Sequence, residues 1–118
     1  MAYLALTRRA LRDIQEIKDY SCEQWGNQVA DEYLSSIEDA LNLLRQNPAL
    51  LREKPNVSNS LCFYRVRQHF LVCTIIHEKV LVLTVKHGAM DLPERIYELE
   101  PLLIQEAEFL HQAITTKR

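Results

Sequence analysis

The first half of the chain places apolar residues at helical intervals between charged ones. From Arg8 to about Glu23 the apolar positions recur every three or four residues, and Thr7 stands where it can cap the first turn. A second segment with the same period begins after Gly26, which can take a left-handed capping conformation, and ends before Pro48. The pattern predicts two amphipathic helices, and their short connection predicts an antiparallel helical hairpin.

The apolar stripes of this hairpin are expected to form core, because a stripe at helical spacing more often packs inward than binds a ligand. The stripes consist of Leu11, Ile14, Ile17, Ile37, Leu41 and Leu44.

The period changes after segment 52–60, which is polar and is predicted to be a loop. Leu61–Val66, Phe70–Ile76 and Lys79–Lys86 are rich in β-branched, aliphatic and aromatic residues and are separated by short polar breaks. They predict a three-stranded antiparallel meander. Ala2–Leu6 is short and apolar and is predicted to be a further strand.

The last quarter of the chain becomes helical again. Asp91-Leu92-Pro93-Glu94 has the form of a capping box with proline in the first turn. Pro101 is predicted to end one short helix and to start another. The apolar stripe of that second helix is Leu102, Leu103, Ala107, Leu110 and Ile114.

The order of the elements predicts an α+β fold. An N-terminal strand and a helical hairpin are packed on a small, mostly antiparallel twisted sheet, with a C-terminal helical extension. We expect the helices to lie on one face of the sheet, so that the uncovered face docks onto another macromolecule. The C-terminal stripe either caps the core or forms a homodimer contact.

Composition narrows the function classes. A chain of 118 residues with 47% hydrophobic and 25% charged residues is typical of one globular domain. No apolar run approaches a membrane span and no signal peptide opens the chain, so we expect a cytoplasmic protein without membrane contact. The three cysteines, Cys22, Cys62 and Cys73, show no CxxC spacing and are expected to be reduced thiols. The two glycines cannot form a phosphate-binding loop.

The charge is distributed unevenly around a net value of −2. Acidic side chains predominate in segments 7–47 and 91–118, which argues against strong direct binding of nucleic acid. Between residues 61 and 90 basic side chains predominate instead. The charge therefore supports at most one local basic surface.

That basic surface supplies the candidate site. It consists of Arg65, Arg67, His69, Lys86 and His87, near the ends of the first and last meander strands. Such groups could stabilise a phosphorane-like transition state while a histidine transfers a proton, as in a metal-independent ribonuclease. Alternatively, they mark the hydrated face of a sheet. The histidine spacing shows no metal site, and we expect no metal or cofactor.

The order of several short patterns is similar to that of a known toxin superfamily. The patterns are Thr7-x-x-Ala10-x-x-Asp13-Ile14-x-x-Ile17-x-x-Tyr20, Trp25-Gly26, Ala30-x-x-Tyr33-Leu34, Asn47-Pro48, Arg65 and Val85-Lys86-His87-Gly88-Ala89-Met90-Asp91. Together they resemble RelE/ParE toxins over about residues 3–98, and the ParE branch best. The resemblance implies a RelE/ParE-like domain over residues 1–98, with residues 99–118 as a helical extension of the same domain.

The resemblance also implies a function. Members of this superfamily, often called plasmid stabilisation proteins, are toxins of type II toxin–antitoxin pairs, and each is neutralised by a cognate antitoxin. ParE-like members inhibit DNA gyrase and block replication without known catalytic residues. RelE-like members cut messenger RNA on the ribosome, and in that case Arg65, Lys86 and His87 would be catalytic.

Charge favours the first of these activities. Thr84 and Met90 occupy positions where the family commonly has arginine, so positive charge is lost. A ribosome-bound nuclease must enter a phosphate-rich cavity, whereas gyrase imposes no such demand. We therefore predict a gyrase-binding toxin that uses Arg65, Arg67, His69, Lys86 and His87 to contact its target. RNA cleavage and a non-toxic binding module are the alternatives.

Overall fold

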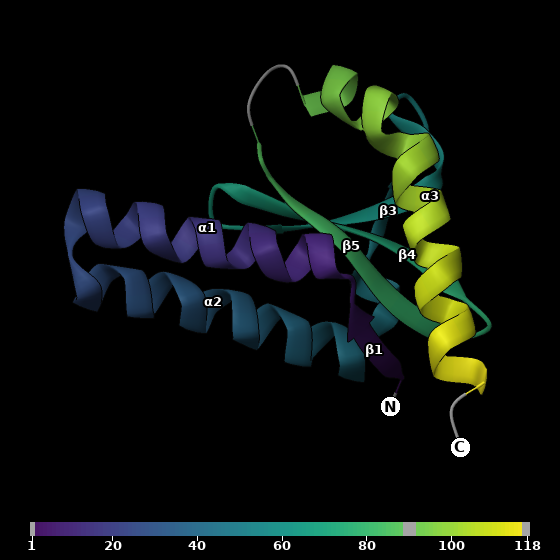
Figure 1. Cartoon of the computed structure of the whole chain (residues 1–118), viewed down its shortest axis with the longest axis horizontal. Coiled ribbons are helices and arrows are strands. Elements are labelled where there is room, and N and C mark those ends of the chain that lie inside the picture. Colours follow the sequence, from purple (N-terminus) through teal and green to yellow (C-terminus); the bar gives the residue numbers. More distant parts are fainter. Residues whose placement is uncertain (1, 89–91, 117–118) are drawn as a thin grey trace.

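The computed structural model describes residues 2–88 and 92–116, which form a five-stranded sheet with three α-helices (Figure 1). The predicted α+β class is confirmed. The elements in chain order are β1 (Tyr3–Leu6), α1 (Arg8–Trp25), α2 (Asn27–Gln46), the 3-10 turn η1 (Pro48–Leu50), β2 (Arg52–Lys54), β3 (Ser58–Val66), β4 (His69–Ile76), β5 (Lys79–His87) and α3 (Leu92–Thr116).

The helical hairpin forms as predicted, and Thr7 ties it to the sheet. The Thr7 hydroxyl accepts a hydrogen bond from the backbone N–H of Ala10 at 3.1 Å and donates one to the carbonyl of Leu83 at 2.8 Å. Gly26 joins the two helices with φ 90° and ψ 171°, a combination that is essentially restricted to glycine. Its φ is positive, as expected, but its ψ is extended rather than left-handed helical.

The sheet has the strand order β1-β5-β4-β3-β2. The meander β3-β4-β5 is antiparallel as predicted, and β1 pairs with β5 in parallel. The prediction of a loop over residues 52–60 is wrong, because this segment contributes β2 and the start of β3. Its charges are compatible with a short edge strand, where one side of the backbone faces solvent.

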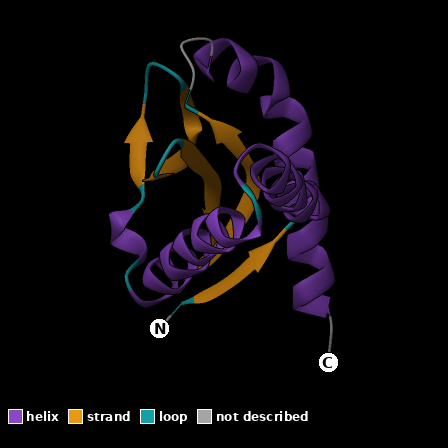
Figure 2. Cartoon of the chain, turned by 90° about the vertical axis from the view of Figure 1, so that its left-hand side faces the viewer, coloured by secondary structure: helices purple, strands orange, loops and turns teal. Residues whose placement is uncertain are grey.

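Helices cover both faces of the sheet, so the prediction of a single helical layer with an open face is wrong. Along β5, Val80 and Val82 join the core beneath the hairpin, whereas Leu81 and Leu83 join a second core beneath α3. Successive side chains of a strand point to opposite faces, so these two cores lie on opposite sides. Figure 2 shows the hairpin almost end-on, with α3 running beside the sheet.

α3 is one continuous helix, so the prediction that Pro101 separates two helices is wrong. Buried residues on both sides of the proline, Ile96 and Leu103, hold the helix against the same core, and this packing compensates the lost backbone hydrogen bond. The first turns run at an angle to the rest, as expected for a proline kink (Figure 1). The predicted capping box begins at Asp91, which lies outside the described residues.

The hairpin core differs from the predicted stripe at one position. Ile37 and Leu44 are fully buried, and Ile14 and Ile17 pack partly buried against the same core, but Leu11 is 56% exposed. The buried positions of α1 are the small residues Ala10 and Ser21 instead. Small side chains allow a close approach of the helix at these two positions.

Candidate functional site

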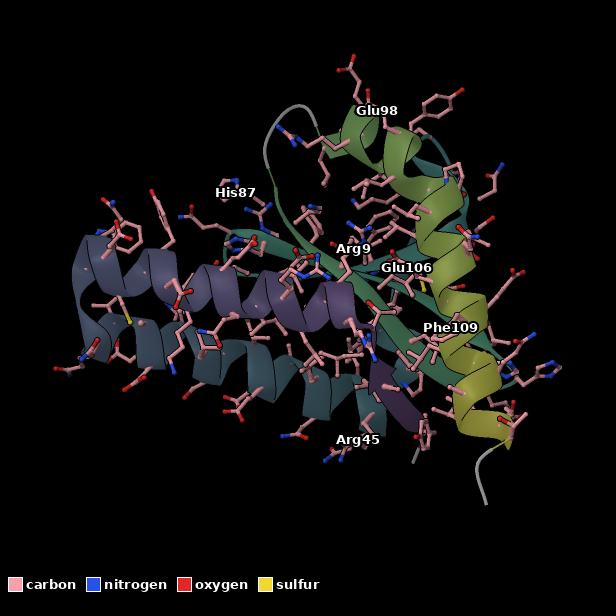
Figure 3. All side chains as sticks on the ribbon, viewed as in Figure 1. Arg9, Arg45, His87, Glu98, Glu106 and Phe109 are labelled. Carbon is pink, nitrogen blue, oxygen red and sulfur yellow. The ribbon has the colours of Figure 1, made fainter. Side chains whose placement is uncertain are left out.

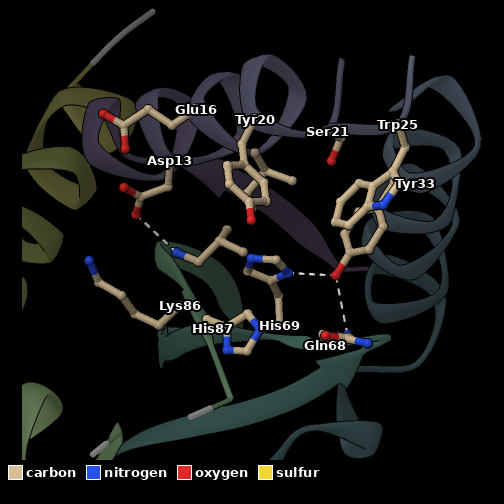
Figure 4. Close-up of a pocket in the computed structure, with 12 residues that line it drawn as sticks. Asp13, Glu16, Tyr20, Ser21, Trp25, Tyr33, Gln68, His69, Lys86 and His87 are labelled. Atoms are coloured by element: carbon tan, nitrogen blue, oxygen red, sulfur yellow. Dashed lines mark hydrogen bonds between the residues drawn. The ribbon is translucent and has the colours of Figure 1, made fainter. Parts of the chain in front are cut away.

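A groove of about 540 Å³ opens where the far half of the hairpin diverges from the ends of β4 and β5 (Figure 4). The helices line one side of it with acidic and aromatic side chains, and the strands line the other with basic and imidazole groups. The side chains that matter below are Asp13, Glu16, Tyr20, Trp25, Tyr33, His69, Lys86 and His87.

Tyr33 joins the second helix to the turn between β3 and β4. Its hydroxyl accepts a hydrogen bond from the Gln68 backbone N–H at 3.2 Å and lies 2.5 Å from Nδ1 of His69. Burial, reinforced by the nearby charge of His87, lowers the pKa of His69 to about 4. His69 is therefore neutral at pH 7, and its Nδ1 shares a hydrogen bond with the Tyr33 hydroxyl.

The two histidines of the groove are cross-strand neighbours. His69 on β4 pairs with His87 on β5, and their rings meet edge to face with centroids 5.2 Å apart. Tyr33 makes a similar edge contact with His69 at 5.4 Å. The three rings form a continuous aromatic column that positions the imidazoles at the end of the sheet.

Asp13 connects α1 to the uncovered edge of β5. β1 pairs with β5 only as far as Leu6 opposite Val82, so the next residues of β5 lack a strand neighbour on that side. The Asp13 carboxylate accepts hydrogen bonds from the Thr84 hydroxyl and, at 3.1 Å, from the Val85 backbone N–H. It thereby satisfies edge groups that a neighbouring strand would otherwise satisfy.

The structure brings together three of the five predicted site residues, His69, Lys86 and His87, and places Arg65 and Arg67 outside the groove lining. Strand register separates Arg65 from His69. Arg65 pairs with Phe70, whereas the next pair along the ladder is Val66 with His69, and adjacent pairs project to opposite faces. Lys86 also pairs with Phe70, but it lines the groove from the part of β5 that has no strand neighbour on the β1 side.

Both arginines have partners of their own within the fold. Arg65 donates from Nε to the carbonyl of Arg67 at 2.8 Å, and its guanidinium lies 5.4 Å from the centre of the Phe70 ring. Arg67, which has φ 54°, donates from Nε to the Ser36 hydroxyl at 2.8 Å. Its guanidinium lies 5.4 Å from the centre of the Tyr33 ring, outside the groove.

Sequence reasoning missed Asp13 and Tyr33 as site residues. In the sequence, Asp13 and Tyr33 stand out only as positions of the family pattern. Nothing in the local sequence indicates that Asp13 meets a strand edge 71 residues away. Helical periodicity places Tyr33 on an inward face, but its hydrogen bond to His69 depends on tertiary geometry.

Other reactive groups of the described residues lie apart from this groove. Burial raises the pKa of Cys62 to about 11 and also raises that of Cys73, so both remain protonated thiols at neutral pH. Within residues 2–88 and 92–116 no group of three or more His, Cys, Asp or Glu side chains could hold a metal ion. None of the helices there is long and apolar enough to cross a membrane.

Comparison with known proteins shows which protein family this chain matches. Residues 4–92 match the family described as the ParE toxin of the type II toxin–antitoxin system parDE. The chain is similar to the curated protein Toxin ParE1 of Caulobacter vibrioides. The two are 23% identical over 84 residues, which cover 64% of this chain and 88% of that protein.

Two solved structures share the fold. One is the chromosomal ParDE system from P. aeruginosa, with a TM-score of 0.67 and 16% identity over 75% of this chain and 98% of that chain. The other is the toxin–antitoxin complex RelBE2 from Mycobacterium tuberculosis, with a TM-score of 0.53 and 16% identity over 73% of this chain and 96% of that chain. The family match ends at residue 92, where α3 begins.

Proposed function

The chain belongs to the ParE family of type II toxin–antitoxin toxins, and from that premise we propose that it binds DNA gyrase in the cytoplasm and inhibits replication. A cognate antitoxin neutralises it. The proposed contact surface is the mouth of the groove, with Lys86 and His87 on the strand side and two exposed aromatic residues on the helix side.

The aromatic pair at the tip of the hairpin is the observation that carries this proposal. Tyr20 and Trp25 are 58% and 60% exposed, and their rings pack edge to face at 5.8 Å. Protein interfaces concentrate their binding energy in Trp, Tyr and Arg anchors. Asp13 and Glu16 line the same groove, and their carboxylates would repel the phosphates of an RNA substrate.

RNA cleavage is the second candidate, because Lys86 and His87 share the groove with His69. A cation and an imidazole in one groove could stabilise and protonate a leaving group. However, His69 is already hydrogen-bonded to Tyr33, and Arg65 lies outside the groove lining. The combination of Arg65, Lys86 and His87 would therefore require rearrangement before it could act on one phosphate.

We propose that the antitoxin lays a helix across the groove instead of adding a strand to β5. Strand addition needs free backbone groups at a sheet edge. On β5 the carbonyl of Leu83 already accepts from Thr7, and the N–H of Val85 already donates to Asp13. Exposed Tyr20 and Trp25 instead offer anchors for the apolar side of a helix.

Two assays on the same purified chain test the proposal, namely inhibition of gyrase supercoiling and ribosome-dependent cleavage of mRNA. We expect inhibition without cleavage. Trp25→Ala should weaken inhibition at least about tenfold, as expected for an interface anchor. Tyr97→Ala is the matched control, because Tyr97 is a 77% exposed aromatic residue on α3, outside the groove lining.

Other results would overturn the gyrase proposal. Cleavage of mRNA that is lost in Lys86→Ala or His87→Ala would assign the chain to the nuclease branch. Neither activity, together with normal growth of cells that express the chain alone, would identify a non-toxic relative.

A further inference from the structure

A second groove, of about 610 Å³, separates the start of α1 from α3 and plays no part in the proposed function. Arg8, Arg9 and Arg12 line it on the α1 side, and Phe109, Leu110 and Ala113 on the α3 side. Figure 3 shows Phe109 on the side of α3 that faces α1. α3 lies almost entirely beyond the family match, so the match does not cover the α3 side of this groove.

α3 carries an exposed apolar stripe in addition to its buried one. Leu102 and Phe109 are 41% and 73% exposed, and their spacing of seven residues places them on one side of the helix together with Ala113. The neighbouring side, with Leu103 fully buried, already covers the sheet. The exposed stripe is therefore apolar surface that does not contribute to the core of the monomer.

Positive charge borders this stripe. Arg9 is paired with Glu106 through two hydrogen bonds of 2.8 and 2.9 Å, whereas Arg8 and Arg12 form no ion pair with another described residue. The first turn of α1 contains no acidic residue to offset its positive helix end. An apolar groove with a cationic border suits an amphipathic helix that carries carboxylates.

The chain itself contains such a helix. Glu94, Glu98 and Leu102 follow one another at four-residue spacing on α3, so the acidic side chains continue the exposed stripe toward its N-terminal end. All three are exposed. α3 thus combines apolar and acidic groups in the arrangement that the groove of another molecule requires.

We propose that the groove is a homodimer interface, in which the α3 helices of two copies pack antiparallel across a two-fold axis. Leu102 packs against Phe109 of the second copy. The same register sets Glu98 opposite Ala113 of the second copy, beside the border formed by that copy's Arg8 and Arg12. The surface is self-complementary, as a two-fold interface requires. Nucleic acid fits less well, because phosphates would leave the apolar stripe unpaired.

Sedimentation equilibrium of the purified chain at micromolar concentration tests this proposal. We expect a mass of twice 13.8 kDa for the wild type and of one chain for Phe109→Asp. Tyr97→Asp should remain dimeric, because Tyr97 is an equally exposed aromatic residue on another side of α3. A monomeric wild type, or a dimer that persists in Phe109→Asp, would overturn the proposal.

A charge exchange tests the register. Arg12→Glu and Glu98→Arg should each weaken dimerisation about tenfold, and the double variant should recover most of the loss. Failure of the double variant to recover, or duplex DNA binding that depends on Arg8 and Arg12, would reject the interface. Phe109→Asp should inhibit gyrase like the wild type, so failure of the gyrase proposal and failure of this one are separable.

Discussion

The two faces of the sheet are covered in different ways. Beneath the hairpin, the core ends at a groove with a polar layer, in which Tyr33 is hydrogen-bonded to His69 and Asp13 is hydrogen-bonded to β5. Beneath α3 the contacts are mainly apolar, with Ile96 and Leu103 fully buried. The polar groups thus gather where the hairpin leaves the sheet. The candidate site and the apolar core beneath α3 therefore lie on opposite sides of the same strands.

Truncating one large core residue on each face gives the largest expected effect. Leu44 on α2 and Leu103 on α3 are both fully buried, so Leu44→Ala and Leu103→Ala should each cost about 2–5 kcal/mol of unfolding free energy. Urea denaturation monitored by circular dichroism measures both. A cost below about 1 kcal/mol for Leu103→Ala alone would show that α3 is only loosely attached, and would break the equivalence of the two cores.

Removing the Asp13 carboxylate tests the polar layer. Asp13→Ala leaves the Thr84 hydroxyl and the Val85 N–H without their acceptor, and should cost about 1–3 kcal/mol in urea denaturation. Glu16→Ala is the matched control, because Glu16 is exposed, lies on the same helix and lines the same groove, and should change stability by less than about 0.5 kcal/mol. Equal effects of the two variants would mean that Asp13 is not a structural connection.

His69, on the groove side of the sheet, should contribute to the pH dependence of the unfolding free energy. Its pKa is about 4 in the folded chain and about 6.5 when unfolded. Between these values the unfolded chain binds a proton that the folded chain does not. The stabilisation is therefore complete above pH 6.5 and is lost as the pH falls toward 4.

Urea denaturation at pH 7.5 and pH 5 measures this loss. Because the ring is only half buried, His69 should contribute about 1 kcal/mol to the decrease. His69→Gln should remove that part and leave the contribution of other groups unchanged. The same decrease in His69→Gln as in the wild type would contradict a neutral, half-buried imidazole.

More of the fold than of the candidate site could be predicted from the sequence. The helical periodicity over Arg8 to Glu23 and the β-branched runs of the meander are local signals. Both predicted elements that are present in the structure. The position of α3 depends on which sheet face needs cover, and no local pattern encodes that choice. Likewise, Arg65 and His69 are both polar and close in sequence, but strand register separates them. Strand register, and hydrogen bonds between elements that are distant in the sequence, could therefore not be predicted.

The smallest expected effect concerns the ion pair that joins the two regions. Arg9 on α1 binds Glu106 on α3 through both oxygens, and this hydrogen bonding raises the pKa of Arg9 and lowers that of Glu106. The pair is partly exposed, so a double-mutant cycle of Arg9→Met and Glu106→Gln should give a coupling of only about 0.2–1 kcal/mol.

Salt and acid should weaken this coupling further. Salt screens the charges, and the stabilisation from the lowered pKa of Glu106 is present above the unfolded value of about 4.3 and is lost as the pH falls through the lower folded value. A coupling above about 2 kcal/mol that persists in 1 M salt would mean that the pair, and not the apolar packing of Ile96 and Leu103, holds α3 in place. The contrast between a polar hairpin face and an apolar α3 face would then no longer hold.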